Sequence, residues 1–256
     1  MDTLAAMELA KNRSSVQVTI CNVVGSQASR IADGVVYTRC GLEIGVCSTK
    51  TFTSSIVALY LLSCYLGQAR GVIRGERIAD LLGPLGQMPH LVGQVTKQAP
   101  TYERLSRSFV KNNHFLFLGR GVQYAVAMEG ALKLKEVSYI HAEGYPAGEM
   151  KHGPIALIDR ETPVVAIAVH DALYEKMMSN VEQVRARGGT VIAIATEGND
   201  GIQDKADYVI SIPECSPWLA PVLTSIPLQF LAYYMAMQRG CDVDQPRNLA
   251  KTVTVE

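Results

Sequence analysis

The sequence lacks both an excess of charge and any long hydrophobic run. It has 24 basic and 24 acidic residues, so its formal net charge at pH 7 is zero. This balance gives no electrostatic reason to expect nucleic acid or an anionic membrane as a partner. The longest apolar stretch, Ile56–Leu66, is too short to span a bilayer and predicts a buried helix. We therefore predict neither a nucleic-acid partner nor a membrane partner.

The sequence also lacks paired cysteines, metal-ligand spacings and a signal peptide. Its six cysteines, at positions 21, 40, 47, 64, 215 and 241, show no C-x-x-C spacing. Reduced thiols in a cytosolic protein fit this pattern best. The five histidines have no ligand spacing, so no metal and no cofactor is predicted. The chain opens without a secretory signal, and the expected localisation is cytoplasmic.

Short β-branched runs alternate with longer helical patterns. The predicted strands are Val16–Cys21, Val35–Thr38, Phe115–Leu118, Val164–Ala168, Thr190–Ala195 and Tyr208–Ile212. The predicted helices are Leu4–Lys11, Thr51–Leu66, Tyr124–Val137, Tyr174–Arg187 and Pro221–Arg239. Several strands are apolar throughout, which is typical of parallel strands buried on both faces. The alternation predicts an α/β fold built from parallel βαβ units.

An internal repeat links the two ends of the chain. The segments around Ile20 and Ala32 match those around Ile194 and Ala206 at a constant offset of 174 residues. The same offset puts the counterparts of strands 115–118 and 164–168 before residue 1. We therefore expect a duplicated unit whose first copy lacks its opening strands and the loops after them, where such sheets hold ligands.

These patterns predict two parallel sheets flanked by helices, the first one incomplete. The expected organisation is a partial first domain at 1–73, a helical connection at 74–104, a second domain at 105–246 and an extended tail at 247–256.

Three charged residues recur on one predicted helix. Glu129, Lys133 and Glu136 follow at steps of four and three, so they share a face. A solvated stripe of ion pairs is the plainer interpretation of this spacing. The surrounding residues are apolar, however, and a carboxylate held beside a lysine in such surroundings is suited to proton transfer.

Three loop segments offer further candidates. His152 lies among glycines and a proline, either as a surface histidine or as an acid–base group. The loop 43–50 precedes a helix, and its backbone and hydroxyls either hold a polar ligand or cap that helix. Cys47 in this loop has no histidine near it in sequence that would make it a nucleophile. Lys251 in the tail can attack a carbonyl once it has lost its proton.

Five ordered motifs resemble the glutamine–fructose-6-phosphate aminotransferase family, also called glucosamine-6-phosphate synthases. They are FLGRG at 117–121, EGALKLKE at 129–136, YIHAE at 139–143, GEMKHGP at 148–154 and DQPRNLAKTVTVE at 244–256. The resemblance runs from Asp2 to Glu256 and implies two sugar isomerase (SIS) domains. It also implies a homodimer that makes glucosamine 6-phosphate from fructose 6-phosphate and glutamine-derived ammonia.

The resemblance implies roles for single residues. Lys251 matches the lysine that forms a Schiff base with the ketose, and Glu136 matches the carboxylate that moves a proton between sugar carbons 1 and 2. His152 matches the ring-opening histidine, which in the family reaches the site of the other subunit. Lys133 is expected beside Glu136 in the catalytic group. The expected substrate-binding positions are Val46, Ser48, Ala250, Glu129 and Arg247.

Two parts of the family pattern are missing: the glutaminase domain with its N-terminal cysteine, and the phosphate-gripping loop expected just before Asp2. Because phosphate contacts position such substrates, residues 1–256 alone are expected to be weak or inactive. Three alternatives stay open. They are a non-catalytic SIS protein that binds sugar phosphate, a remnant that only dimerises, and a phosphosugar isomerase that uses no ammonia.

Overall fold

The computed structural model describes residues 2–250 of the chain. They form two compact units. The first unit runs to Ile78 and also includes the segment that starts at Arg247, and the second unit is Ala79–Pro246. Residues 79–104, which the sequence pattern assigns to a connection, thus lie within the second unit.

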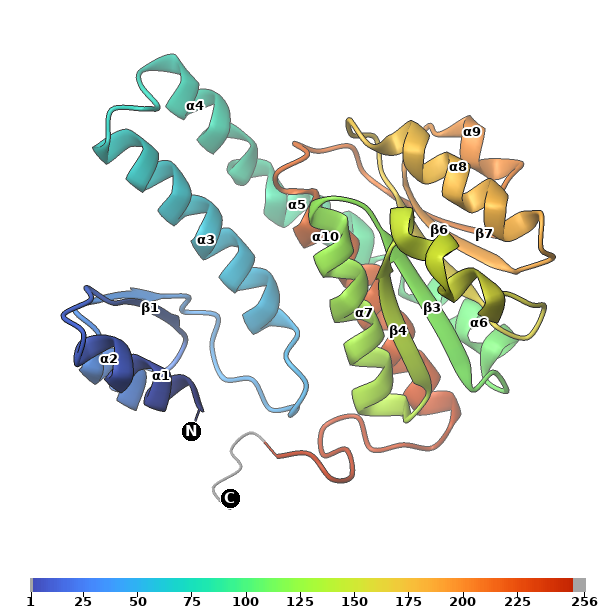
Figure 1. The fold of residues 1–256 in the computed structure, drawn as a ribbon, viewed down its shortest axis with the longest axis horizontal. Helices are drawn as coiled ribbons and strands as arrows, with labels where there is room; N and C mark the ends of the chain where they lie inside the picture. Colours follow the sequence, from blue (N-terminus) through green and yellow to red (C-terminus); the bar gives the residue numbers. More distant parts are fainter. Residues whose placement is uncertain (1, 251–256) are drawn as a thin grey trace. The chain divides into compact units, whose positions relative to one another are not determined.

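The first unit contains a two-stranded parallel sheet (Figure 1). Its elements are α1 (Asp2–Lys11), β1 (Val18–Cys21), α2 (Gln27–Ile31), β2 (Gly34–Tyr37), α3 (Lys50–Ala69) and α4 (Glu76–Leu82), which continues into the second unit. The Ser26 hydroxyl caps α2 by accepting the backbone N–H of Ser29 at 3.4 Å. Strands β1 and β2 with α2 between them form one of the predicted parallel βαβ units.

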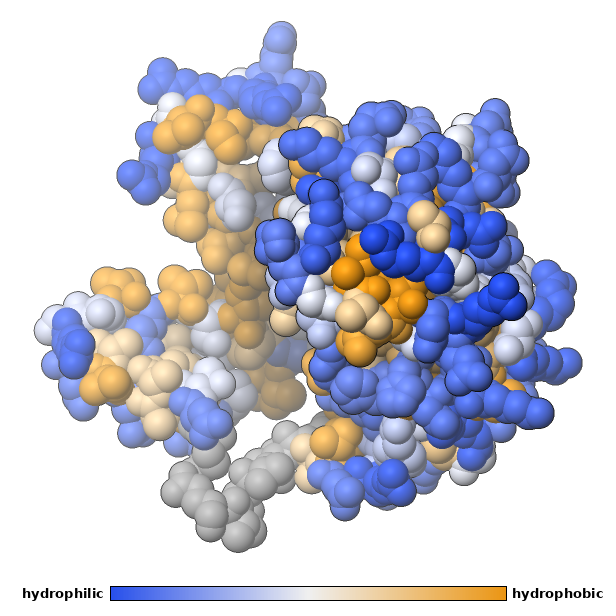
Figure 2. Space-filling view, turned by 45° about the vertical axis from the view of Figure 1, so that its right-hand side comes forward, coloured by the Kyte–Doolittle hydropathy of each residue, from blue (hydrophilic) through white to orange (hydrophobic). Residues whose placement is uncertain are grey.

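Helix α3 carries many apolar side chains that are not buried. Within it only Ala58 and Cys64 are buried, whereas Leu59 and Leu61 are 54% and 44% exposed. Figure 2 shows the hydrophobic colouring along this helix. The expectation of a buried helix is therefore wrong, because among the described residues α3 packs mainly against β1. By length and composition alone, α3 is also the one described helix that could cross a membrane.

The second unit is built on a five-stranded parallel sheet with the strand order β4-β3-β5-β6-β7. The helical elements before the sheet are η1 (Gly83–Gln87), α5 (Met88–Thr96) and α6 (Ala99–Phe109). The sheet and its connections are β3 (His114–Gly119), α7 (Val122–Ser138), β4 (His141–Pro146), η2 (Ala147–His152), η3 (Pro154–Leu157), β5 (Val164–Ala168), α8 (Tyr174–Arg185), β6 (Val191–Thr196), α9 (Asp200–Gln203), β7 (Tyr208–Ile212) and α10 (Ala220–Gln238).

Both faces of this sheet are covered, which explains its apolar strands. Leu116 of β3 packs in a cluster with Met150 of η2 and Met177 of α8 on one face. On the other face α7 and α10 lie side by side (Figure 1). The buried Phe115 ring lies 6.1 Å from the ring of Phe109 in α6. Burial of such a side chain contributes about 1.5–3 kcal/mol.

The structure confirms the internal repeat. Val18 of β1 pairs with Gly34 of β2, and Ile192 of β6 pairs with Tyr208 of β7, so both pairs have the same register. One side-chain contact is repeated as well. Asp33 Oδ2 accepts the backbone N–H of Gln17 at 2.8 Å, and 174 residues later Asp207 Oδ2 accepts that of Val191 at 2.8 Å. Both copies are therefore the same βαβ unit.

All six predicted strands and all five predicted helices are present, with ends shifted by at most three residues. Strand β4 was not predicted. It forms one edge of the sheet and pairs in parallel with β3, from His141 beside His114 to Pro146 beside Gly119.

Candidate functional site

Strand β3 leads into α7 at the point where the strand order changes direction. The chain leaves β3 toward β4 on one side, and β5 lies on the other. In open α/β sheets, ligands bind outside the carboxyl ends of strands at such points. Gly119 permits the sharp turn, since a Cβ atom here would lie 2.2 Å from the backbone oxygen of Gln123. Gly121 then caps α7 with a φ of 53°.

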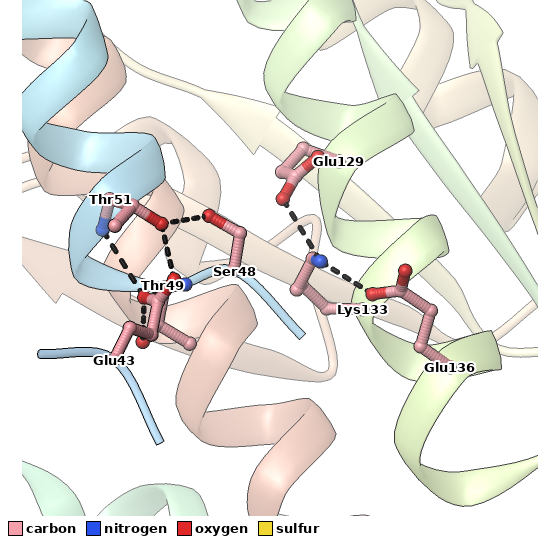
Figure 3. Close-up of polar contacts among 7 residues, drawn as sticks. All are labelled: Glu43, Ser48, Thr49, Thr51, Glu129, Lys133 and Glu136. Carbon is pink, nitrogen blue, oxygen red and sulfur yellow. Dashed lines mark hydrogen bonds and ion pairs between the residues drawn. The ribbon is translucent and has the colours of Figure 1, made fainter. Parts of the chain in front are cut away.

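The three candidate residues of α7 form one ion-paired cluster. Lys133 Nζ lies 2.5 Å from Glu136 Oε2 and 3.4 Å from Glu129 Oε1 (Figure 3). The side chain of Lys133 is only 5% exposed, and those of Glu129 and Glu136 are 15% and 22% exposed. A lysine this deeply buried is rare unless it is paired. The cluster is therefore not the solvated stripe that the spacing alone favoured.

Burial and charge act on Glu129 in opposite directions. Desolvation raises the pKa of this carboxyl, and the nearby Glu136 charge adds to the rise. The Lys133 ammonium opposes it through its charge and its hydrogen bond, but the net result is a raised pKa. A carboxyl of this kind holds a proton more readily than an exposed one. The cluster thus combines a buried cation with two carboxyl groups of different environment, a combination suited to moving a proton.

The loop before α3 is organised by a carboxylate. Glu43 Oε1 accepts the backbone N–H of Thr49 at 2.9 Å and that of Thr51 at 3.3 Å, so this residue caps the helix (Figure 3). The capping interpretation of the loop is therefore confirmed. Of the predicted substrate positions here, Val46 and Ser48 are both half-buried. The sequence analysis included Glu43 in the loop but did not identify its carboxylate as the cap, and it gave no role to Thr51.

The remaining predicted residues belong to other segments of the chain. His152 ends η2 with its side chain exposed, and this side chain makes no hydrogen bond or ion pair with another described residue. Arg247 and Ala250 are exposed and belong to the first unit. Lys251 lies outside the described residues. Within residues 2–250, no group of three or more His, Cys, Asp or Glu side chains is placed to hold a metal ion.

A family model described as the SIS domain matches residues 108–239, just over half of the chain. This span holds the five-stranded sheet and the α7 cluster. The match agrees with the α/β fold of parallel strands flanked by helices.

Two curated relatives match the whole chain. The glutamine–fructose-6-phosphate aminotransferase (isomerizing) of Thermus thermophilus is 51% identical over 256 residues. The protein of the same name from Bacteroides thetaiotaomicron is 50% identical over 255 residues. The chain spans 42% of the length of each of these relatives.

Two solved structures of proteins with glucosamine in their names are also similar to the chain. The C-terminal domain of glucosamine-fructose-6-phosphate aminotransferase from Francisella tularensis superposes with a TM-score of 0.91 at 38% identity, over 95% of this chain and 69% of that chain. A glucosamine-6-phosphate deaminase from Thermotoga maritima has a TM-score of 0.68 at 25% identity, over 98% of this chain and 70% of that one.

Proposed function

The chain belongs to the SIS domain family, among the C-terminal domains of glutamine–fructose-6-phosphate aminotransferases, and from this premise we propose that it forms the isomerase portion of such an enzyme. Its substrate is fructose 6-phosphate and its product is glucosamine 6-phosphate. The ammonia comes from glutamine, through a glutaminase domain of the longer protein. We place the enzyme in the cytoplasm and expect a homodimer.

One observation carries this proposal: a buried lysine held between two carboxylates on α7. A solvent-facing ion pair contributes about 0–1 kcal/mol to the stability of the folded protein, and it forms without any burial of its charges. A buried pair costs desolvation energy, which makes it weak as a device for stability alone. A cluster of ionisable groups that includes a carboxyl with a raised pKa, as Glu129 has here, is a candidate functional site. The Glu129–Lys133–Glu136 cluster therefore supports acid–base chemistry on a bound substrate.

The proposed reaction needs one base that serves two adjacent carbons. The Lys251 amine first replaces the carbonyl oxygen at sugar carbon 2 as an imine, with loss of water, and ammonia then displaces the lysine amine. A proton leaves carbon 1 and one is added to carbon 2, while the hydroxyl at carbon 1 loses its hydrogen and the nitrogen gains one, which leaves an aldehyde at carbon 1 and an amine at carbon 2. We assign this transfer to Glu136, which Lys133 holds at 2.5 Å. We assign ring opening to His152 and the first Schiff base to Lys251.

Product analysis tests this assignment. The protein is incubated at high concentration with fructose 6-phosphate and an ammonium salt, and glucosamine 6-phosphate is measured by mass spectrometry. Glu136→Gln removes the base and lowers the rate by about 10²- to 10⁴-fold. Glu103→Gln is the matched control, because Glu103 makes an ion pair with Arg107 within one helix on the exposed surface of α6. Glucose 6-phosphate as the sole product, or equal rates for both variants, contradicts the proposal.

Mixing two inactive variants tests the homodimer with shared sites. Glu136→Gln disables the base and His152→Ala disables ring opening. If His152 serves the partner's site, a mixed dimer holds one intact site, and equal mixing restores roughly a quarter of the wild-type rate. No recovery, although mixed dimers form, contradicts shared sites.

A further inference from the structure

The loop 43–51 contains a chain of polar groups in a fixed order. Glu43 Oε1 is committed to the helix backbone, since it accepts the N–H groups of Thr49 and Thr51. Glu43 Oε2 accepts the hydroxyl hydrogen of Thr51. Thr51 Oγ1 in turn lies 2.5 Å from Ser48 Oγ (Figure 3). The order of the chain is therefore Glu43, Thr51, Ser48.

The direction of this chain follows from counting hydrogens. A carboxylate only accepts, and a hydroxyl has one hydrogen to donate. Because Thr51 gives its hydrogen to Glu43, it cannot also donate to Ser48. Ser48 must therefore donate to Thr51. The oxygen of Ser48 then keeps only lone pairs for any further partner.

We infer that Glu43 and Thr51 set Ser48 as a hydrogen-bond acceptor, so that it selects a sugar hydroxyl rather than a phosphate oxygen. A sugar hydroxyl can donate to the lone pairs of Ser48, whereas an ionised phosphate oxygen cannot. The inference rests on the proposed function, in which Ser48 contacts the sugar. Glu43 and Thr51 act through Ser48 and are positioning residues.

Replacing Glu43 by glutamine allows the hydrogen bonds from Glu43 through Thr51 to Ser48 to reverse their direction, and it keeps the cap on helix α3. The amide oxygen of the introduced side chain stays with the two backbone N–H groups, which need an acceptor. Its NH₂ group then faces Thr51 Oγ1 and donates to it. Thr51 no longer faces a carboxylate, so its hydrogen is free to turn to Ser48, and the hydrogen of Ser48 can then point outward. The variant Glu43→Gln therefore keeps the fold but allows Ser48 to act as a donor.

Fluorinated sugars detect this reversal, because a fluorine cannot donate a hydrogen bond. Affinity is measured for fructose 6-phosphate and for its analogues with fluorine in place of the hydroxyl at carbon 3, 4 or 5. In the wild type, fluorine at the contacted carbon weakens binding about 2- to 12-fold, the equivalent of one hydrogen bond. In Glu43→Gln the loss of affinity caused by the fluorine is smaller than in the wild type, because the Ser48 hydrogen can point toward the sugar. Thr53→Val is the matched control, since the Thr53 hydroxyl donates to the Lys50 carbonyl at 3.0 Å and is outside the chain.

Equal discrimination in the wild type and in Glu43→Gln overturns the inference, and so does its loss in Thr53→Val. If the wild type binds none of these sugars, the proposed function fails instead. The direction of the chain is then read by neutron diffraction of the unliganded protein. The inference is supported if the hydroxyl deuterium of Ser48 points toward Thr51 Oγ1. It is overturned if the hydroxyl deuterium of Thr51 points toward Ser48 Oγ.

Discussion

Replacing Lys133 by methionine tests how the α7 cluster is held together. Methionine keeps much of the side-chain volume but removes the charge between Glu129 and Glu136. Breaking a buried pair by removing one partner costs about 3–5 kcal/mol, because it leaves an uncompensated charge. We expect this loss at pH 8, measured as the free energy of unfolding in urea. Lys135→Met is the matched control, since Lys135 is exposed on the same helix and its replacement changes stability by about 0.5 kcal/mol or less.

The pH dependence of Lys133→Met gives a second readout. Burial already raises the pKa of Glu129, and without the Lys133 ammonium it rises further. The native state then binds more protons than the unfolded state between the ordinary pKa of this carboxyl and its raised value. The stability of the variant is therefore retained at a pH below the ordinary pKa of a glutamate. It is lost as the pH rises through the raised pKa of Glu129. Each unit of additional rise adds about 1.4 kcal/mol to the loss at pH 8 relative to acid pH.

A second substitution separates charge from packing. Adding Glu129→Gln to Lys133→Met removes the charge of the more buried of the two carboxyl groups, and part of the lost stability returns. The reasoning is refuted if Lys133→Met and Lys135→Met have equal effects, or if the loss in Lys133→Met does not change with pH.

Three further predictions concern other parts of the second unit. Gly119→Ala places a Cβ within 2.2 Å of the Gln123 backbone oxygen, and we expect it to destabilise the protein by about 1–3 kcal/mol. Gly83→Ala is the control, because no atom lies within 4 Å of the new Cβ, and it should leave the stability unchanged. Urea unfolding compares the two variants. Hydrogen bonds from Thr162 and from the Glu161 backbone lower the pKa of Asp159, so an NMR titration should place it below 3.8, and a higher value contradicts the contacts. Asp159→Asn removes the stability that these bonds provide above the ordinary pKa of aspartate, and its difference from the wild type shrinks as the pH falls.

The sequence pattern predicts most of the fold because its strands are apolar runs. Strands buried on both faces need apolar residues throughout, and the pattern reports this directly. Strand β4 escaped prediction because it contains Gly144 and Pro146, which are depleted in strands. Tertiary packing explains both residues. Pro146 is tolerated because β4 is an edge strand, and Gly144 is needed because a Cβ there would lie 2.7 Å from the Met128 Cα atom. Neither fact is visible before α7 is placed on the sheet.

The candidate site was predictable in part. Helical spacing puts Glu129, Lys133 and Glu136 on one face, but spacing alone does not show whether that face meets solvent or protein. Burial of Lys133 is a property of the assembled unit. The contact between Glu43 and Thr51 joins residues eight apart, one in a loop and one in the first turn of α3. No sequence pattern reports such a contact.

The central claim is that the α7 cluster moves a proton between carbons 1 and 2 of a sugar phosphate. The most direct measurement is the incorporation of solvent deuterium into fructose 6-phosphate in D₂O, followed by NMR at carbon 1. The account predicts label at carbon 1 with the wild type and about 10²-fold or more slower labelling with Glu136→Gln. Label at carbon 1 that forms as fast with Glu136→Gln as with the wild type would contradict it.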